Sequence, residues 1–308
     1  MTGAPRPADR RSCIAVVTLV TDPALYATSI GSVARAARRV GVDLELQPVC
    51  CADHGWNAAQ GLNHGIDQTK ARWVLCIHQD VVLPSPWFCW AQEQIARAGG
   101  SDAWPVTETN ATASPAVIGT VGTTASGRFA GAVLDPNGYC RWGRGPTDVA
   151  SLDEHLLLLD RESGLRFDAD VPGFHAYGTD LVLQARAAGH RAVAIDAPVV
   201  HASSGTIDAA WNAAAAWIVD RWTDHRGEVV PTPARTMHHS GTTAFTARPA
   251  MHRATVALHR RLAVHTRRLR QVAGGRWAMP ATVREELVDC IRGLPSDVQE
   301  RMGRANVG

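Results

Sequence analysis

The residues most able to do chemistry are His78, Gln79 and Asp80, which follow a short apolar run. That run, WVLCI (73–77), is too short for a long helix and is typical of a buried strand in a parallel sheet. Open α/β sheets bind ligands at the carboxyl ends of such strands, so polar side chains here would face a crevice. Asp80 offers hard oxygen ligands that suit Mg²⁺ or Mn²⁺. The alternative is that Asp80 only caps the turn that follows.

A second group of candidates lies later in the chain. Asp180 opens a predicted helix that runs to Gly189, and His201 ends the next predicted strand, RAVAIDAPVVHA. Asp180 could simply be a helix N-terminal charge, worth a few tenths to about 1 kcal/mol. His201 could be a core histidine whose hydrogen bonds are satisfied. Arg144, in a hairpin-like segment at 131–149, could meet a phosphate, although a solvated arginine is the commoner case.

The elements around these residues predict an α/β fold with a Rossmann-like, mostly parallel sheet flanked by helices. Strands at 13–20, 44–49 and 73–77 alternate with helices at about 23–40 and 58–71, an order that favours right-handed crossovers. Further predicted elements are a helix at 87–98, a glycine-interrupted strand at 116–124, strands at 152–161 and 191–201, and a helix from 209. Residues 99–115 are predicted to form a loop.

The C-terminal segment, residues 233–308, is predicted to be a linker followed by a helical extension. Residues 249–272 have the pattern of a basic amphipathic helix, which could bind an acidic lipid surface but more often packs on its own domain or on a second subunit. A last helix is predicted to end at Pro295, before a disordered tail. These C-terminal helices make a homodimer plausible.

Composition excludes several classes of protein. Net charge is +2, which is too small to favour nucleic acid, and 45% hydrophobic with 19% charged residues is typical of a globular chain. The apolar run CIAVVTLV (13–20) is too short to span a membrane and lacks a cleavage-site pattern, so no membrane anchor is predicted. The seven cysteines form no CxxC pair, which fits reduced thiols in a cytoplasmic protein. No dinucleotide or P-loop fingerprint follows any predicted strand.

Four segments, in order, resemble the family-2-type glycosyltransferases of the GT-A fold. They are LNHGI (62–66), HQDVVLP (78–84), FDADVPGFHAYGTDLVLQARAAG (167–189) and HASSG (201–205). The resemblance is greatest to the branch that includes glycosyltransferases of streptomycin-type antibiotic clusters. It covers residues 12–232, which we therefore expect to form a GT-A-like catalytic domain.

The resemblance implies a nucleotide-diphosphate-sugar donor, a divalent cation (Mn²⁺ or Mg²⁺) and transfer to a small-molecule acceptor such as a natural product. Asp80 matches the last acid of the family's metal-binding motif, and His201 matches a histidine that binds the metal in some members. Contacts with the donor are then expected from the following residues: Val20, Thr21, Asp53, Asn63, His78, Gln79 and Arg144.

The chain departs from the family at the catalytic base. The close branch has the sequence YD.D, whereas this chain has Tyr177-Gly178-Thr179-Asp180, and glycine cannot accept a proton. Asp180 or His175 could take the role, or the acceptor could be activated in another way. Two further alternatives remain open: a nucleotide-sugar-binding protein that has lost catalysis, and a nucleotidyltransferase. The latter normally has a glycine-rich basic loop after its first strand, where this chain has VTDPALY (20–26).

Overall fold

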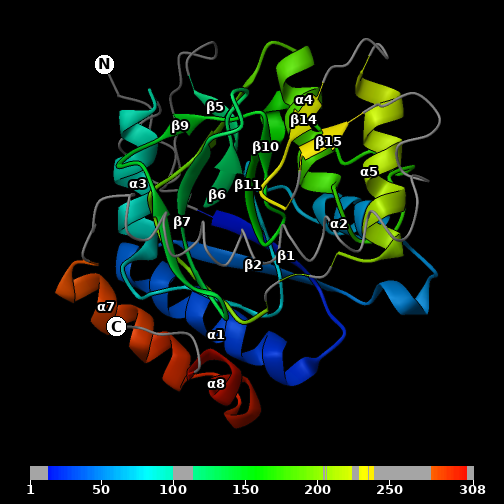
Figure 1. Cartoon of the computed structure of the whole chain (residues 1–308). Coiled ribbons are helices and arrows are strands. Elements are labelled where there is room, and N and C mark those ends of the chain that lie inside the picture. The colour runs from blue at the N-terminus through cyan, green and yellow to red at the C-terminus, as the bar shows by residue number, and fades with distance from the viewer. Residues whose placement is uncertain are drawn as a thin grey trace, which may run out of the picture.

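A seven-stranded sheet forms the centre of the molecule (Figure 1). The computed structural model describes residues 13–99, 114–203, 205, 207–223, 229–234, 236–238 and 279–303. In the sheet, β1 pairs in parallel with β2 and β3, and β12 pairs in parallel with β5. Strands β11 and β9 run antiparallel to their neighbours. The order is β2 (Asp43–Val49), β1 (Cys13–Leu19), β3 (Trp73–Ile77), β11 (Leu156–Asp160), β5 (Pro115–Gly119), β12 (Arg191–Ala194) and β9 (Thr147–Asp148). The predicted α/β fold with a mostly parallel sheet is confirmed.

Helices cover both faces of this sheet because the residues of a strand point alternately to its two faces. Ile14 and Val16 of β1 share one buried cluster with α1 (Pro23–Val40) and α3 (Trp87–Arg97). Ala15 and Val17 share the opposite cluster with α2 (Ala58–Asp67) and α4 (Tyr177–Ala187). The result is a three-layer arrangement with two hydrophobic cores.

The start of α1 follows from local sequence. The side chain of Asp22 accepts hydrogen bonds from the backbone N–H groups of Ala24 and Leu25. Pro23 suits the first helical position because it lacks the backbone N–H that would have no partner within the helix there. Gly41 ends the helix in the left-handed conformation, with φ of 70°. The Asp22 cap fixes the loop between β1 and α1 at the carboxyl edge of the sheet.

A second, smaller sheet was not predicted. Its strands are β10 (Ser151–Leu152), β6 (Val121–Thr123), β7 (Phe129–Asp135), β13 (Val200–His201) and β4 (Val81–Val82), with β8 (Gly138–Trp142) paired to β7. The glycine-interrupted strand predicted at 116–124 divides into β5 in the large sheet and β6 in the small one. The prediction of one continuous strand at 191–201 was wrong, because it too is broken and passes from the large sheet to the small one. Gly131 allows the first crossing, since a Cβ there would lie 2.0 Å from the carbonyl oxygen of Thr120. Between β12 and β13, Pro198 has no backbone N–H to donate to a neighbouring strand.

The remaining elements form two additional layers (Figure 1). Helix α5 (Ala209–Trp222) and the two-stranded sheet of β14 (Val229–Pro231) and β15 (Thr236–His238) share a cluster next to α4. Helices α7 (Ala281–Arg292) and α8 (Ser296–Gly303) pack on the small sheet through Leu287 and Met302, against Leu134 and Val200. The prediction of a disordered tail after Pro295 was therefore wrong for residues 296–303, which form α8. The division at 232/233 falls inside the β14–β15 sheet, and the predicted basic helix at 249–272 lies outside the described residues.

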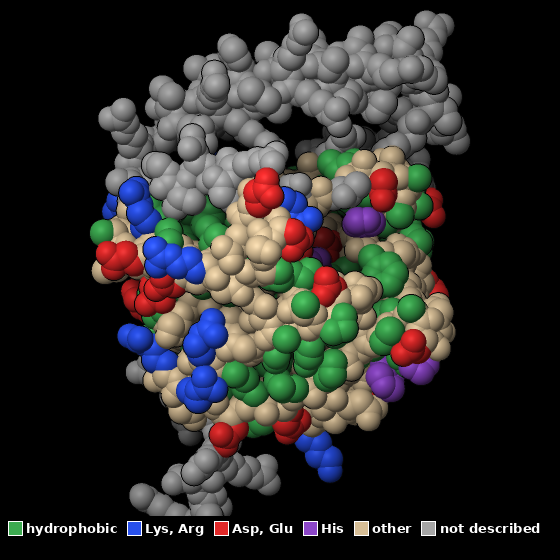
Figure 2. Space-filling model, turned by 90° about the horizontal axis from the view of Figure 1, so that it is seen from below, with side chains coloured by type: hydrophobic (Ala, Val, Ile, Leu, Met, Phe, Trp, Pro, Cys, Tyr) green, Lys and Arg blue, Asp and Glu red, His purple; other side chains and the backbone are tan. Residues whose placement is uncertain are grey.

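The face seen from below has an uneven distribution of charge (Figure 2). Hydrophobic side chains gather near its centre, Lys and Arg on one side and histidines at the opposite edge. None of the helices in the described part of the chain is both long and apolar enough to cross a membrane.

Candidate active site

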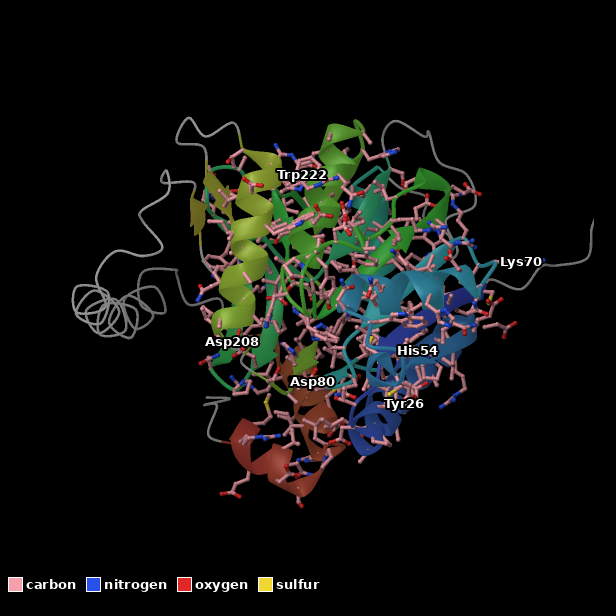
Figure 3. The ribbon with its side chains drawn as sticks, turned by 90° about the vertical axis from the view of Figure 1, so that its right-hand side faces the viewer. Tyr26, His54, Lys70, Asp80, Asp208 and Trp222 are labelled. Carbon is pink, nitrogen blue, oxygen red and sulfur yellow. The ribbon has the colours of Figure 1, made fainter. Side chains whose placement is uncertain are left out.

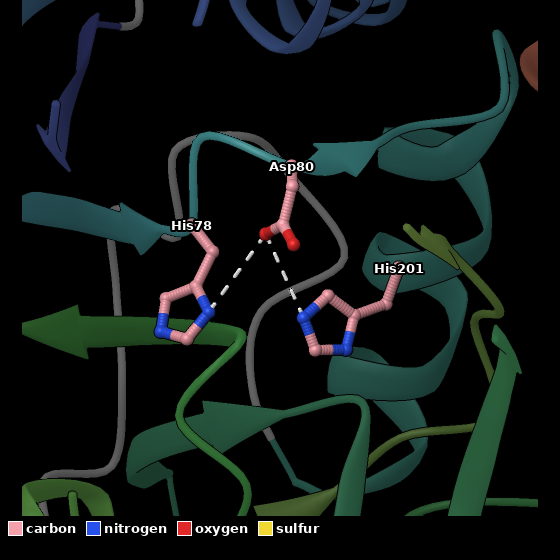
Figure 4. Close-up of side chains that lie close together, drawn as sticks. All are labelled: His78, Asp80 and His201. Atoms are coloured by element: carbon pink, nitrogen blue, oxygen red, sulfur yellow. Dashed lines mark ion pairs between the residues drawn. The ribbon is translucent and has the colours of Figure 1, made fainter. Parts of the chain in front are cut away.

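Three side chains converge where the large sheet meets the small one. His78 follows β3, Asp80 precedes β4, and His201 ends β13, which pairs with β4 so that His201 lies opposite Val81. Asp80 Oδ1 is 3.6 Å from His201 Nε2 and 4.0 Å from His78 Nδ1 (Figure 4). One atom from each side chain lies within 4.8 Å of the others, so the three could share one metal ion. Sequence reasoning named Asp80 and His201 as metal ligands and His78 as a contact to the sugar donor, and the structure brings the three side chains together.

The electrostatics of this metal cluster (His78, Asp80 and His201) suit metal binding. Burial, helped by the neighbouring His201, lowers the pKa of His78 to about 4. Burial also lowers the pKa of His201. Burial opposes ionisation of Asp80, but the imidazoles of His201 and His78 outweigh it and hold the pKa of Asp80 below its usual value. Near pH 7 the cluster therefore consists of two neutral imidazoles with free lone pairs and one carboxylate.

A second set of side chains orients the imidazoles. His78 Nε2 lies 2.8 Å from the hydroxyl of Tyr177, which leaves Nδ1 facing Asp80. His201 stacks on His155 with ring centroids 5.0 Å apart. The His155 ring is buried between Asp153 Oδ1, 2.7 Å from Nδ1, and Thr120 Oγ1, 2.6 Å from Nε2. Hydrogen bonds of this kind commonly fix the tautomer and orientation of metal-binding histidines.

The loop after β1 is attached to the same edge by Gln79. Its Oε1 accepts from the backbone N–H groups of Thr21 and Asp22, both at 2.8 Å, and its Nε2 donates to Thr21 Oγ1 at 2.7 Å. Val20 donates to the carbonyl of Val49 at the end of β2. Asp53 lies in the short helix after β2 (Cys51–Asp53), at the carboxyl edge shared by β1, β2 and β3. The view of Figure 3 shows Asp80 between Asp208 and the labelled Tyr26 and His54.

Two residues that were expected to contact the nucleotide-sugar donor lie away from the metal cluster. The side-chain amide of Asn63 is bonded on both sides to the backbone of Phe167, donating at 2.7 Å and accepting at 3.1 Å, so it fastens α2 to the 167 segment. Arg144 lines a cavity of about 450 Å³ with Trp90, Tyr139 and Arg141, whose lining includes no member of the metal cluster. The structure does not bring either residue to the cluster.

The two predicted catalytic residues are also held in other contacts. Asp180 is fully buried, and its carboxylate accepts from Trp222 Nε1 at 2.7 Å and from Gln184 Nε2 at 2.5 Å. Burial raises the pKa of Asp180, although these two donors oppose the shift. His175 Nε2 lies 3.8 Å from Asp208 Oδ1, at the start of α5. Both side chains therefore face α5.

Sequence reasoning missed Glu154, which lies between β10 and β11. The backbone N–H groups of Ala176 and Gly178, at the start of α4, favour its charged form and lower its pKa. Burial, together with the charge of Asp153, nevertheless raises the pKa of Glu154 to about 8. The only signal in the sequence was the run Asp153-Glu154-His155, which placed three titratable residues before the apolar LLLL.

Comparisons with known proteins give weak similarities. No protein-family model matches the chain. A segment of 61 residues is 48% identical to "ATP synthase subunits region ORF 6" of Fuscovulum blasticum; it covers 20% of this chain and about a quarter (24%) of that curated relative. Among solved structures, a mannosyltransferase from Pyrobaculum calidifontis in complex with GDP-Man and Mn²⁺ has a TM-score of 0.41 at 13% identity, covering 71% of this chain and 63% of that chain. TarS 1-349 from S. aureus in complex with UDP-GlcNAc has a TM-score of 0.40 at 10% identity, covering 92% and 82%. The function is therefore inferred from the chain's own residues.

Proposed function

We propose that this protein is a metal-dependent glycosyltransferase that moves a sugar from a nucleotide-diphosphate donor to a small-molecule acceptor. The observation that carries the proposal is the convergence of His78, Asp80 and His201 at the carboxyl edge of a mostly parallel sheet. That edge is where open α/β sheets bind ligands. The loop at Thr21, fastened by Gln79, borders the same edge.

The donor atoms of the cluster fit Mn²⁺ better than Mg²⁺. Imidazole nitrogen suits first-row transition ions, whereas Mg²⁺ prefers oxygen ligands. Three protein ligands leave coordination positions for phosphate and water. When bound, the ion supplies Lewis-acid stabilisation of the negative charge that grows on a departing diphosphate.

The chain's own residues account for binding and orientation. His78 and His201, both neutral near pH 7, would bind the metal ion, and the Tyr177 hydroxyl holds the ring of His78 in place. Gln79 fixes the Thr21 loop, which with Asp53 is expected to face the nucleotide. We further propose that 12–232 form the catalytic domain and that 233–308 are an extension whose helices α7 and α8 support β13. A cytoplasmic location is part of the same proposal.

The proposal is tested by a thermal-shift screen of nucleoside diphosphates, each with Mn²⁺, with Mg²⁺ and with no metal. We expect one nucleotide to raise the Tm with Mn²⁺, since a ligand at 100 times its Kd adds about 2.7 kcal/mol to the free energy of unfolding. Asp80→Asn should lose the shift. Asp43→Asn is the matched control, because Asp43 is exposed at the opposite, amino end of β2.

Two outcomes separate the proposal from its rivals. A protein whose Tm responds to no nucleotide with either metal is not a nucleotide-sugar transferase. A protein that binds the nucleotide but releases none from any nucleotide-sugar would be the inactive binding protein instead. Release of pyrophosphate from a nucleoside triphosphate would indicate the nucleotidyltransferase.

A further inference from the structure

A small pocket between the β10–β11 connection, α4 and α5 holds a carboxyl group that the binding roles above do not use. The pocket has a volume of about 20 Å³, enough for a single water molecule, and Glu154 lines it with Thr179, Trp211, Thr232 and Met237. Asp153 also lines the pocket, and its other lining residues are uncharged. Unlike Asp180, which is fully buried, Glu154 is only partly buried.

Glu154 is connected to the metal cluster on two sides. Its neighbour Asp153 holds His155, whose ring stacks on His201. On the other side, Gly178 contacts Glu154 and follows Tyr177, whose hydroxyl bonds to His78. Both imidazoles of the cluster are thus supported by residues next to Glu154 or in contact with it.

The start of α4 is shaped around this carboxyl group. Ala176 adopts φ of 64°, the one positive φ at a non-glycine residue in the described part of the chain, and its backbone N–H favours the charged form of Glu154. Such strain costs on the order of 1–3 kcal/mol and is concentrated at functional sites. At the next contact, a Cβ on residue 178 would lie 3.1 Å from Glu154 Cγ and 3.1 Å from the carbonyl oxygen of Leu152. A side chain at 178 and the side chain of Glu154 would compete for one place.

From this geometry we propose that Glu154 is the general base of the transfer reaction. Its carboxylate accepts the proton of an acceptor hydroxyl, or of a water molecule when the donor is hydrolysed. The acceptor oxygen forms a bond to the anomeric carbon of the sugar. The bond from that carbon to the diphosphate oxygen breaks, and its electron pair leaves with the diphosphate. The inference rests on the proposed function and assigns its proton acceptor.

The environment of Glu154 matches that role. A base that works near neutral pH needs a pKa near the working pH, and the pKa of Glu154 is raised to about 8. The titratable groups that face it are Asp153 on its own segment and Tyr177 on α4. The pocket's other lining residues from α5, β14, β15 and their connection are uncharged.

The test measures nucleoside diphosphate released from a panel of UDP-, GDP- and dTDP-sugars by the full chain with Mn²⁺, with water as acceptor. Glu154→Gln keeps the shape but cannot accept the proton, so we expect kcat to fall by about 10²-fold or more. The KM for the donor and the Mn²⁺-dependent Tm shift should stay within about twofold of wild type. Glu285→Gln, an exposed change on α7, is the matched control and should behave as wild type.

A relocation experiment protects the test against simple misfolding. Glu154→Ala alone should be as slow as Glu154→Gln. Adding Gly178→Asp places a carboxyl group in the space that Glu154 leaves, and we expect it to restore kcat at least about tenfold over Glu154→Ala. Restored turnover would show that the reaction needs a carboxyl group in this space, which packing by Glu154 alone does not explain.

The possible outcomes can be told apart. Wild-type turnover with an unimpaired Glu154→Gln overturns the assignment of the base and leaves the transferase intact. A Glu154→Gln protein that also loses the Tm shift assigns Glu154 to binding or folding and likewise overturns it. A wild type that releases no nucleoside diphosphate from any donor overturns the transferase and the base together.

Discussion

Asp80 and Glu154 both lie close enough to Tyr177 to raise its pKa, but their own surroundings shift their pKa values in opposite directions. Asp80 faces two imidazoles, which lower its pKa despite its burial. Glu154 faces a small pocket of uncharged residues and the charge of Asp153, so its pKa rises to about 8. One carboxyl group therefore remains charged and can hold a cation, while the other can exchange a proton near neutral pH. A pair of acids with divergent pKa values is a common basis for dividing roles in an active site.

One turn of helix supports both acids. Tyr177, the first residue of α4, holds His78 in the metal cluster, and Gly178, the second, packs against the side chain of Glu154. A shift of this turn would move both sites together. Substitutions that change one side at a time can separate them.

The largest effect is expected from Asp80→Ala. Removing the only carboxylate of the metal cluster should lower metal-dependent turnover by on the order of 10²–10³-fold, the usual cost of losing a main electrostatic contact in a transition state. The Mn²⁺-dependent Tm shift should disappear, while the apo Tm stays close to wild type. Turnover that persists and still depends on Mn²⁺ would exclude Asp80 as a ligand.

Tyr177→Phe tests the support of the cluster. It removes the hydroxyl that bonds to His78 Nε2, so the ring loses its orientation but keeps its packing. Removing such a partner typically weakens metal binding 10–100-fold. Titration of Mn²⁺ against turnover should show this weakening, with kcat at saturating Mn²⁺ much less affected. An unchanged Mn²⁺ titration would show that the hydroxyl does not position His78.

The pH dependence of turnover and of nucleotide binding should distinguish the roles of Glu154 and Asp80. Glu154 must be ionised to accept a proton, so turnover should rise about tenfold between pH 7 and pH 9 with an apparent pKa of about 8. Mn²⁺-dependent nucleotide binding should stay nearly flat there, because the pKa of His78 is about 4. A pH profile for binding that follows the profile for turnover would contradict this division.

Ionisation of Glu154 should also lower the stability of the folded protein, over the pH range that leads up to its pKa. The folded protein holds the Glu154 proton more tightly than the unfolded chain, whose glutamate has its ordinary pKa of 4.5. The free energy of unfolding should therefore fall as pH rises from about 4.5 to about 8. Denaturant titrations of Glu154→Gln should show a shallower fall over that range than wild type.

The large sheet and the metal cluster could be predicted because their signals are local. Buried strands such as WVLCI are continuous apolar runs, and His78 and Asp80 follow one directly. His201 was named because it ends an apolar run and matches a metal-binding histidine in some members of the family that the chain resembles. The second sheet was not predicted, because its strands are two or three residues long in places and continue runs that looked unbroken. The break near Thr120 depends on Gly131, which lies on a different strand.

The proton acceptor could not be predicted from the sequence because its position depends on a contact between distant segments. Gly178 alone showed that an acid was missing; nothing in the sequence showed that Glu154 fills the space. Asp180 and Asn63 have residue types suited to a site, but their polar atoms are taken up by Trp222, Gln184 and the backbone of Phe167. Residue type and helix position predict which groups could act, whereas tertiary hydrogen bonds decide which are open to a ligand.

Trp222→Phe is expected to have the smallest effect on activity and tests this last point. It removes the donor to Asp180 Oδ1 and leaves a buried carboxyl group with one partner fewer. Leaving a buried polar group unsatisfied costs about 1–3 kcal/mol, so the free energy of unfolding should fall by that amount. Turnover should change less than about twofold, since Asp180 fastens α4 to α5 and takes no proton from the acceptor. A large fall in kcat at unchanged stability would return Asp180 to the chemistry and weaken the case for Glu154.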